Sequence, residues 1–435
     1  MDVAIQAGLV LLVVFAFFLI IGTPIAFTII ISSVATAIVI FPMDKSIIIA
    51  AQKVATGVDK LTLLAIPFFI LAGIIMNNGG IAVRLVNFAK VLSGRMPGSL
   101  AHTNIVGNML FGAISGSAVA SAAAMGGILG PMQEKEGYDK RFSATVNIAS
   151  APTGLLIPPS NVLITYSLVS GGTSVAALFM AGYLPGILWG LLTMLVAYII
   201  AKRNNYPVSE KIPGKLKLKL FLDAIPSLLL IIIVIGGITA GIFTATEGAA
   251  VAVVYALFLS MVVYRSLKFK DLPQILLETS KTTAIIMFLI AGSTIMSYVM
   301  TVAGIPQLIS ESILGITDNP IAILLIMNLI LLLIGTFMDM TPAILIFTPI
   351  LLPIATQLGM DPIHFGIMIT MNLCIGSITP PVGNCLFIGS KVGNVSIDSV
   401  IKPLLPYYFV IIIGLLITTF IPELTLWIPR ITGNL

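Results

Sequence analysis

Long apolar segments recur along the chain from end to end, and they constrain the possible folds more than any other feature. Each is long enough, at roughly 17 to 25 residues, to cross a hydrocarbon core about 30 Å thick as a helix. Only 9% of the 435 residues are charged and the mean hydropathy is +1.13, whereas a soluble domain carries about 25% charged residues. The sequence therefore predicts an all-α integral membrane protein.

Residue types that carry catalysis are scarce and scattered. His102 and His364 are isolated, and Cys374 and Cys385 lack the CxxC spacing of a zinc or redox site. No glycine-rich nucleotide loop ending in Lys-Ser or Lys-Thr is present. The net charge of +5 resides in short loops between apolar segments, which fits membrane orientation better than nucleic-acid binding. We therefore expect neither an enzyme nor a partner among nucleic acids.

Polar or proline-containing stretches interrupt the apolar pattern at four places. Backbone that is not helical at membrane depth is tolerated only where protein or a water-filled cavity satisfies it, so such interruptions tend to line a site. Small and hydroxylated residues between two half-length apolar pieces predict a hairpin that enters the membrane and turns back. We predict such re-entrant hairpins over about 98–133 and 320–357, and broken helices over about 142–170 and 362–390 with breaks at Pro158, Pro159, Pro380 and Pro381.

The second half of the chain repeats the first at an offset of about 222 residues. This offset places Gly154 on Gly376 and Pro158-Pro159 on Pro380-Pro381, and it superposes both predicted hairpins. We therefore expect two repeats, 1–201 and 223–435, joined by a basic cytoplasmic linker over 202–222.

Lysine and arginine residues set the expected orientation. If the N-terminus is periplasmic, 18 of the 22 fall in cytoplasmic segments, and only Lys45, Lys53, Lys60 and Arg430 lie outside them. Cytoplasmic loops carry the excess of positive charge, so this orientation is strongly favoured. It makes the repeats inverted, an arrangement typical of secondary transporters whose sites lie at helix breaks near the midplane.

Asp339 is the most informative side chain at these breaks. A carboxylate near the centre of a bilayer costs roughly 2.5 to 3.5 kcal/mol on insertion scales, so one retained there usually faces a polar interior. We interpret Asp339 as an ion ligand or gate. It could instead cap the following helix or pair with a buried cation.

Oxygen-rich side chains and freed carbonyls at the breaks suit a hard monovalent cation such as Na⁺. Helix N-termini at the hairpin tips could also attract a substrate carboxylate. The candidate Na⁺ ligands are Ser115, Gly116, Ser117, Pro158 and Asn161 in the first half, and Gly335, Thr336, Asp339, Thr379 and Gly383 in the second. The candidate substrate ligands are Ser117, Ser121, Ser160, Asn161, Thr341 and Asn384.

Several of these motifs together resemble the large membrane subunit of tripartite ATP-independent periplasmic (TRAP) transporters, of the DctM or SiaM type. The resemblance covers nearly the whole chain. It is carried by Gly22-Thr23-Pro24, Ile66-Pro67-Phe68-Phe69-Ile70-Leu71-Ala72-Gly73, Gly116-Ser117-Ala118-Val119-Ala120-Ser121, Leu156-Ile157-Pro158-Pro159-Ser160, Gly241-Ile242-Phe243-Thr244-Ala245-Thr246-Glu247 and Ile378-Thr379-Pro380-Pro381-Val382-Gly383.

The resemblance implies a Na⁺-driven importer of the bacterial inner membrane. Its expected partners are a separate small membrane subunit of the DctQ or SiaQ type, a soluble periplasmic binding protein of the DctP or SiaP type, and a small organic acid. It also implies an elevator, in which a transport domain of about 98–180 and 318–400 moves against a scaffold formed by the remainder. The chain is most similar to members that take up sialic acid, and we adopt that substrate as the hypothesis.

Other interpretations stay open at this point. Family members also carry C4-dicarboxylates and other organic acids. A stand-alone Na⁺/dicarboxylate carrier would have similar hairpins and need no binding protein. A channel subunit or membrane-embedded enzyme is a different class, but a channel more naturally has parallel symmetry about a pore, and an enzyme needs clustered catalytic groups.

Overall fold

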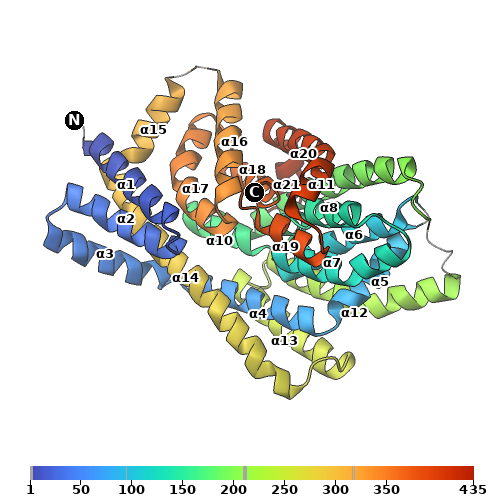
Figure 1. Ribbon diagram of the computed structural model, residues 1–435. Coiled ribbons are helices and arrows are strands. Elements are labelled where there is room, and N and C mark those ends of the chain that lie inside the picture. Colours follow the sequence, from blue (N-terminus) through green and yellow to red (C-terminus); the bar gives the residue numbers. More distant parts are fainter. Residues whose placement is uncertain (1–2, 95, 209–212, 316, 318) are drawn as a thin grey trace.

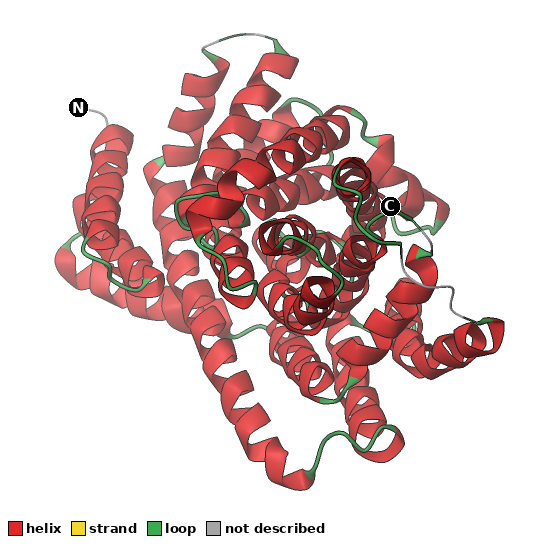
Figure 2. Cartoon of the chain, turned by 45° about the vertical axis from the view of Figure 1, so that its right-hand side comes forward, coloured by secondary structure: helices red, strands yellow, loops and turns green. Residues whose placement is uncertain are grey.

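The computed structural model describes residues 3–94, 96–208, 213–315, 317 and 319–435. These described residues form helices and turns and contain no strand (Figure 2). The helices of the first half are α1 Val3–Ile20, α2 Ile25–Ile40, α3 Met43–Val58, η1 Leu61–Leu64, α4 Ala65–Asn78, α5 Ile81–Ser93, α6 Ser99–Ser115, α7 Ala118–Lys135, α8 Lys140–Ser150, α9 Thr153–Leu156, α10 Asn161–Val169 and α11 Val175–Arg203.

The second half has a matching series of helices. They are α12 Gly214–Thr239, α13 Ala245–Phe258, η2 Leu259–Val263, η3 Phe269–Asp271, α14 Leu272–Ala303, α15 Ile305–Leu314, α16 Pro320–Phe337, α17 Met340–Gln357, α18 Pro362–Ser377, α19 Asn384–Val392, α20 Ile397–Phe420 and α21 Glu423–Ile431.

Within the described part of the chain, nine helical segments are long and apolar enough to cross a membrane, judged by length and composition. The predicted class of all-α, multi-span membrane protein is therefore confirmed. These segments are Val3–Ile20, Leu61–Asn78, Val175–Arg203, Gly214–Thr239, Ala245–Val263, Phe269–Ala303, Pro320–Phe337, Met340–Gln357 and Ile397–Phe420.

Some boundaries differ from the sequence-based expectation. The linker expected over 202–222 is shorter, because α12 already begins at Gly214 and carries Lys215, Lys217 and Lys219 on its first turns. The apolar segment at residues 281–302 is part of the 32-residue helix α14, which at 1.5 Å per residue is about 48 Å long. Three further helices, α3, α15 and α21, were not predicted. Each has an apolar face, but with 16, 10 and 9 residues they are shorter than the helices counted as candidate membrane spans.

Two helix pairs and two interrupted helices occupy the ranges for which the sequence predicts hairpins and broken helices. Helices α6 and α7 form the first hairpin and α16 and α17 the second, and the turns fall at Gly116-Ser117 and Met338-Asp339. The first broken helix stops at Leu156 and resumes at Asn161, and the second stops at Ser377 and resumes at Asn384. The peptide bonds Pro158-Pro159 and Pro380-Pro381 are both cis.

Paired glycines hold each hairpin against its broken helix in the same way. In the first repeat the backbone of Gly112 packs directly on Gly154, and in the second Gly335 packs on Gly376. A Cβ at either Gly154 or Gly376 would overlap the facing backbone. Only glycine permits so close an approach, and the contact fixes where each hairpin tip stands.

The two repeats meet at the broken helices. The thiol of Cys374 lies 3.8 Å from the carbonyl oxygen of Pro152, and these residues are 222 positions apart, which is the repeat offset. This contact brings the middle parts of the two broken helices together.

Helix α14 packs against helices from both halves of the chain. In Figure 1 it runs diagonally, with α1, α2 and α3 beside its C-terminal part and α4 beside its N-terminal part. It also contacts α17 of the second hairpin. Since α14 touches both the peripheral helices and a hairpin, it borders the candidate site.

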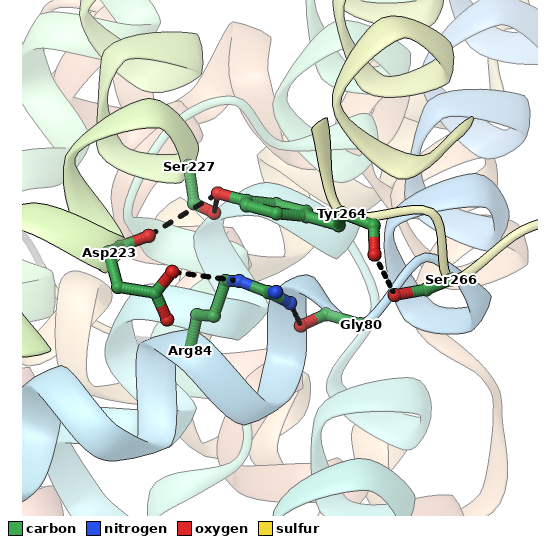
Figure 3. A network of polar contacts seen from close by, with 6 residues as sticks. All are labelled: Gly80, Arg84, Asp223, Ser227, Tyr264 and Ser266. Atoms are coloured by element: carbon green, nitrogen blue, oxygen red, sulfur yellow. Dashed lines mark hydrogen bonds and ion pairs between the residues drawn. The ribbon is translucent and has the colours of Figure 1, made fainter. Parts of the chain in front are cut away.

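A polar cluster joins α5 to α12 and to the turn after η2 (Figure 3). The guanidinium of Arg84 lies 3.5 Å from the ring centroid of Tyr264, and its Nε lies 3.4 Å from a carboxylate oxygen of Asp223. The Tyr264 hydroxyl is 2.9 Å from the Ser227 hydroxyl. These contacts fasten α5, directly before the first hairpin, to its neighbours.

We predict that Gly376→Ala destabilises the fold, because the added methyl group overlaps the Gly335 backbone. Overpacking of this kind costs about 1 to 3 kcal/mol or more, so the melting temperature in detergent should fall by several degrees. Gly127→Ala is the matched control, since a Cβ there meets open space. Equal melting temperatures for the two variants would contradict the packing assignment.

Candidate functional site

The two hairpin tips and the two helix breaks meet at one cavity of about 620 Å³, a size typical of small-molecule sites. We call it the hairpin cavity. Helices α4 and α14 close its other side. Its polar and charged lining residues are Asn77, Ser115, Ser117, Asn161, Glu278, Lys281, Thr282, Asp339, Thr341, Ser377 and Asn384.

Four helix N-termini point at this cavity. Its lining includes the first residues of α7, α10, α17 and α19, namely Ala118, Asn161, Met340 and Asn384. The N-terminus of a helix carries about half a positive charge and unpaired N–H groups, which favour anions. The convergence makes the cavity suited to a carboxylate, even though no arginine lines it among the described residues.

The first hairpin tip is fixed by short polar contacts. Ser117 caps α7 by accepting a hydrogen bond from the backbone N–H of Ala120 at 3.2 Å. Gly116 adopts φ +61°, and a Cβ there would lie 2.9 Å from the Asn161 amide nitrogen. A Cβ at Gly73 of α4 would lie 2.8 Å from the Ser115 carbonyl oxygen. Because Gly73 and Gly116 have no Cβ, the first hairpin tip can pack closely between α4 and α10.

The second hairpin tip is tied to the second helix break. Asp339 stands at the N-cap position of α17, but its side chain makes no capping hydrogen bond. Instead it accepts one from the Asn384 side chain at 2.8 Å. The backbone N–H of Val382 also donates to the Thr336 carbonyl oxygen at 3.1 Å. The exposed carboxylate of Asp339 faces the hairpin cavity, so the alternative of a simple helix cap is not what the geometry shows.

Some of the predicted ligands line the cavity and others do not. Those that line it are Ser115, Gly116, Ser117, Asn161, Asp339, Thr341 and Asn384. Those that lie outside its lining are Ser121, Pro158, Ser160, Gly335, Thr336, Thr379 and Gly383.

The residues outside the lining have identifiable structural contacts. Ser121 is buried between α6 and α7 and donates to the Asn108 side chain at 2.7 Å. Ser160 caps α10, accepting from the N–H of Leu163 at 3.5 Å. Thr379 donates to the Ile375 carbonyl oxygen at 2.7 Å. A role for Ser121 or Ser160 as a substrate ligand is therefore not supported by their positions.

Oxygen atoms near both breaks fit a hard cation. The Asn161 side-chain oxygen is buried and accepts no hydrogen bond from the described residues. At the second break, the carbonyl oxygens of Ser377 and Thr379 converge on Gly383, where a Cβ would lie 2.8 Å from each. The Thr379 carbonyl oxygen already accepts a hydrogen bond from the Gly383 N–H at 3.1 Å, whereas the Asn161 side-chain oxygen lacks a described partner. Oxygen ligands of this kind suit a hard cation such as Na⁺.

Sequence reasoning missed the contribution of α4 and α14. Asn77, Glu278, Lys281 and Thr282 all line the hairpin cavity. Residues 278, 281 and 282 are spaced so that they share one face of a helix, and this spacing was a usable signal. Which way that face points depends on how α14 packs against the hairpins, and no local pattern shows that.

A helical membrane protein in which hairpin tips and broken helices present polar and charged side chains to one cavity belongs to the class of solute transporters. The model of the family "Tripartite ATP-independent periplasmic transporter, DctM component" matches residues 12–424. The chain therefore belongs to this family of large permease subunits of organic-acid transporters, and it is not an enzyme.

Relatives of similar length support this assignment. The chain is 56% identical over 417 residues to the uncharacterised protein YgiK of Salmonella typhimurium, covering 96% of each chain. It is 40% identical to the sialic acid TRAP transporter large permease protein SiaM of Vibrio cholerae, covering 94% and 95%. It is also 40% identical to the C4-dicarboxylate TRAP transporter large permease protein DctM of Pseudomonas aeruginosa, covering 92% and 93%.

A solved structure shares the fold. The YdaH transporter of Alcanivorax borkumensis, described as having an unusual topology, superposes with a TM-score of 0.61 over 86% of each chain. The sequence identity is 13%, so this similarity concerns the fold alone.

We predict that Asp339→Asn lowers uptake of the transported acid at least about tenfold. The change keeps the side-chain shape but removes a charge, and contacts to a charged group contribute roughly 1.5 to 3 kcal/mol. Initial rates in proteoliposomes check this. Glu311→Gln, on α15 and away from the cavity, is the control. If the Asp339→Asn variant took up the acid at the same initial rate as the control, a role for Asp339 in the site would be contradicted.

Proposed function

We propose that this large permease subunit imports N-acetylneuraminate, a sialic acid, and couples its entry to Na⁺. The observation that carries the proposal is the convergence of four helix N-termini on the hairpin cavity. An organic carboxylate bound there would meet the positive ends of α7, α10, α17 and α19. The hydroxyl groups of Ser117 and Thr341 could donate hydrogen bonds to it.

Sodium ions would balance the charge of the loaded site. Asp339 and Glu278 bring two negative charges to the cavity and Lys281 brings one positive charge. A bound carboxylate adds another negative charge, which favours simultaneous binding of cations. The proposed Na⁺ positions lie at the Asn161 side-chain oxygen beside the first tip, and at Asp339 and the carbonyl groups around Gly383 beside the second.

Binding of both solutes would change the contacts of the tips. The first tip touches α4 and α10, and the second touches α19 through Asp339 and Asn384. A ligand held by both tips would link the hairpins into one unit with the broken helices. We propose that this unit, about 98–180 and 318–400, then slides as an elevator against the remaining helices.

The choice of a sialic acid follows the resemblance of the sequence motifs, and similarity to known permeases does not separate the two candidate substrates. The sialic acid permease of Vibrio cholerae and the C4-dicarboxylate permease of Pseudomonas aeruginosa are equally similar to this chain at 40% identity. A C4-dicarboxylate is therefore the second candidate. Four N-termini and one lysine would suit either anion, and the binding protein would contribute to the choice.

The proposed partners follow from the family. A large TRAP permease works with a small membrane subunit and a periplasmic binding protein, and we propose that both assist this chain in the bacterial inner membrane with its N-terminus periplasmic. The binding protein would deliver the acid to the periplasmic side.

Uptake into proteoliposomes holding this chain and the small subunit tests the proposal. We predict that labelled N-acetylneuraminate accumulates only with an inward Na⁺ gradient and the binding protein present, because the cavity needs cations to hold an anion beside Asp339. Liposomes with an equal K⁺ gradient are the control.

Each other outcome has a defined meaning. Uptake of succinate but not N-acetylneuraminate would replace the substrate with a C4-dicarboxylate. Uptake without the binding protein would favour a stand-alone carrier. Uptake that is independent of Na⁺ would contradict the coupling.

A further inference from the structure

A second cavity, of about 340 Å³, lies along the same helix α14 but beyond the hairpin cavity. We call it the basic vestibule. It lies between α3, the C-terminal end of α10, the C-terminal half of α14 and one residue of α17. The residues used below are Lys53, Lys60, Ser297, Tyr298 and Leu345.

The described charged side chains that line the vestibule are all positive. Lys53 and Lys60 line it, and its described lining contains no carboxylate. Asp59 is next to Lys60 in the sequence but does not line it. The ammonium group of Lys53 lies 4.2 Å from the ring centroid of Tyr298, a cation–π contact that holds it at the cavity wall. The hairpin cavity, by contrast, contains Asp339 and Glu278.

Only a thin layer separates the two cavities. On α14 the hairpin cavity reaches Ile286 and the vestibule begins at Ile290, and on α17 the corresponding residues are Thr341 and Leu345. Each step is four residues, or about 6 Å along a helix. The residues within these steps include Leu289 of α14 and Ala343 and Ile344 of α17, whose side chains are apolar and buried, so the layer opposes the passage of an anion.

The direction along α14 assigns the vestibule to one face of the membrane. Lys281, at the hairpin cavity, is one of the 18 positive residues that the predicted orientation places in cytoplasmic segments, and residues 290–301 lie further along α14 toward the opposite face. Lys53 and Lys60 are also two of the four positive residues that the predicted orientation places outside the cytoplasmic segments. A role in attracting anions explains why positive charge is retained there.

We infer that the basic vestibule is an anion-binding entry chamber on the periplasmic side of the predicted orientation. A small organic carboxylate would pass through it on the way to the hairpin cavity. This inference rests on the proposed function. The two lysines raise the local concentration of the anion where it leaves the binding protein. The apolar layer keeps it out of the hairpin cavity until the hairpins move.

Charge-selective labelling of a cysteine in the vestibule tests the inference without requiring transport. The variant Ser297→Cys is expressed, and right-side-out membrane vesicles that contain it are treated with two thiol reagents of similar size. One is the anionic sulfonatoethyl methanethiosulfonate, and the other is the cationic trimethylammonioethyl methanethiosulfonate. The chain without the added cysteine is the blank, since Cys374 and Cys385 are buried. Thr301→Cys, on the same cavity wall, replaces Ser297→Cys if that variant does not fold.

We predict that the anionic reagent reacts preferentially, and that Lys53→Gln with Lys60→Gln lowers the ratio of anionic to cationic rates by about threefold to tenfold. Lys45→Gln, on the same helix but outside the vestibule, should leave the ratio unchanged. N-acetylneuraminate or succinate at saturating concentration should slow the anionic reagent. An unchanged ratio in the double variant, or no reaction at either cysteine from this face, would overturn the inference.

Uptake assays separate this inference from the proposed function. If the wild-type chain transports the acid, the double lysine variant should raise the KM at least about threefold with little change in the maximal rate, because entry is affected rather than the hairpin site. Absence of uptake by the wild-type chain would count against the proposed substrate, while the labelling ratio would still decide the charge of the vestibule.

Discussion

Backbone groups that leave a helix inside the membrane must find partners in the protein, in water or in a ligand, and the rest of this structure depends on that constraint. The chain leaves regular helix at two hairpin tips and two breaks, and it brings all four together. Gly112 on Gly154 and Gly335 on Gly376 allow the backbones to touch. Residues at both tips and at the ends of both breaks therefore line one cavity.

The electrostatics of the site follow from the same arrangement. Four helices that begin at the two tips and the two breaks direct their N-termini into the cavity, which favours an anion. Asp339 and the free oxygen of Asn161 favour a cation beside it. An anion and cations that bind to adjacent positions stabilise each other. This mutual dependence is the physical basis that we propose for coupling the organic acid to Na⁺.

Helix α14 contributes to the walls of both cavities. It lines the hairpin cavity with Lys281 and the basic vestibule with Ser297, and one helical turn separates the two cavities. A short movement of the transport unit along α14 could therefore change which of the two cavities the bound acid can reach. The acid would then enter through the basic vestibule.

The breaks were predictable from the sequence because prolines and small polar residues interrupt long apolar runs, and the repeat offset identified equivalent positions. Composition alone established the membrane-spanning class. Asp339, Asn161 and Thr341, which line the hairpin cavity, were identified in this way. The positions of Ser121 and Ser160 outside the lining could not be predicted, since a serine at a tip can equally bond to a neighbouring helix. The contributions of Lys281 and Lys53 depend on how α14 and α3 pack, and distant contacts of this kind leave no local pattern.

The most direct test of the central claim is a cryo-EM map of the chain with its small subunit in lipid nanodiscs, at saturating Na⁺ and transported acid. The account predicts density for the acid between Ser117 of the first tip and Thr341 of the second, within reach of Asn384. Density for the acid that contacts neither tip would contradict it.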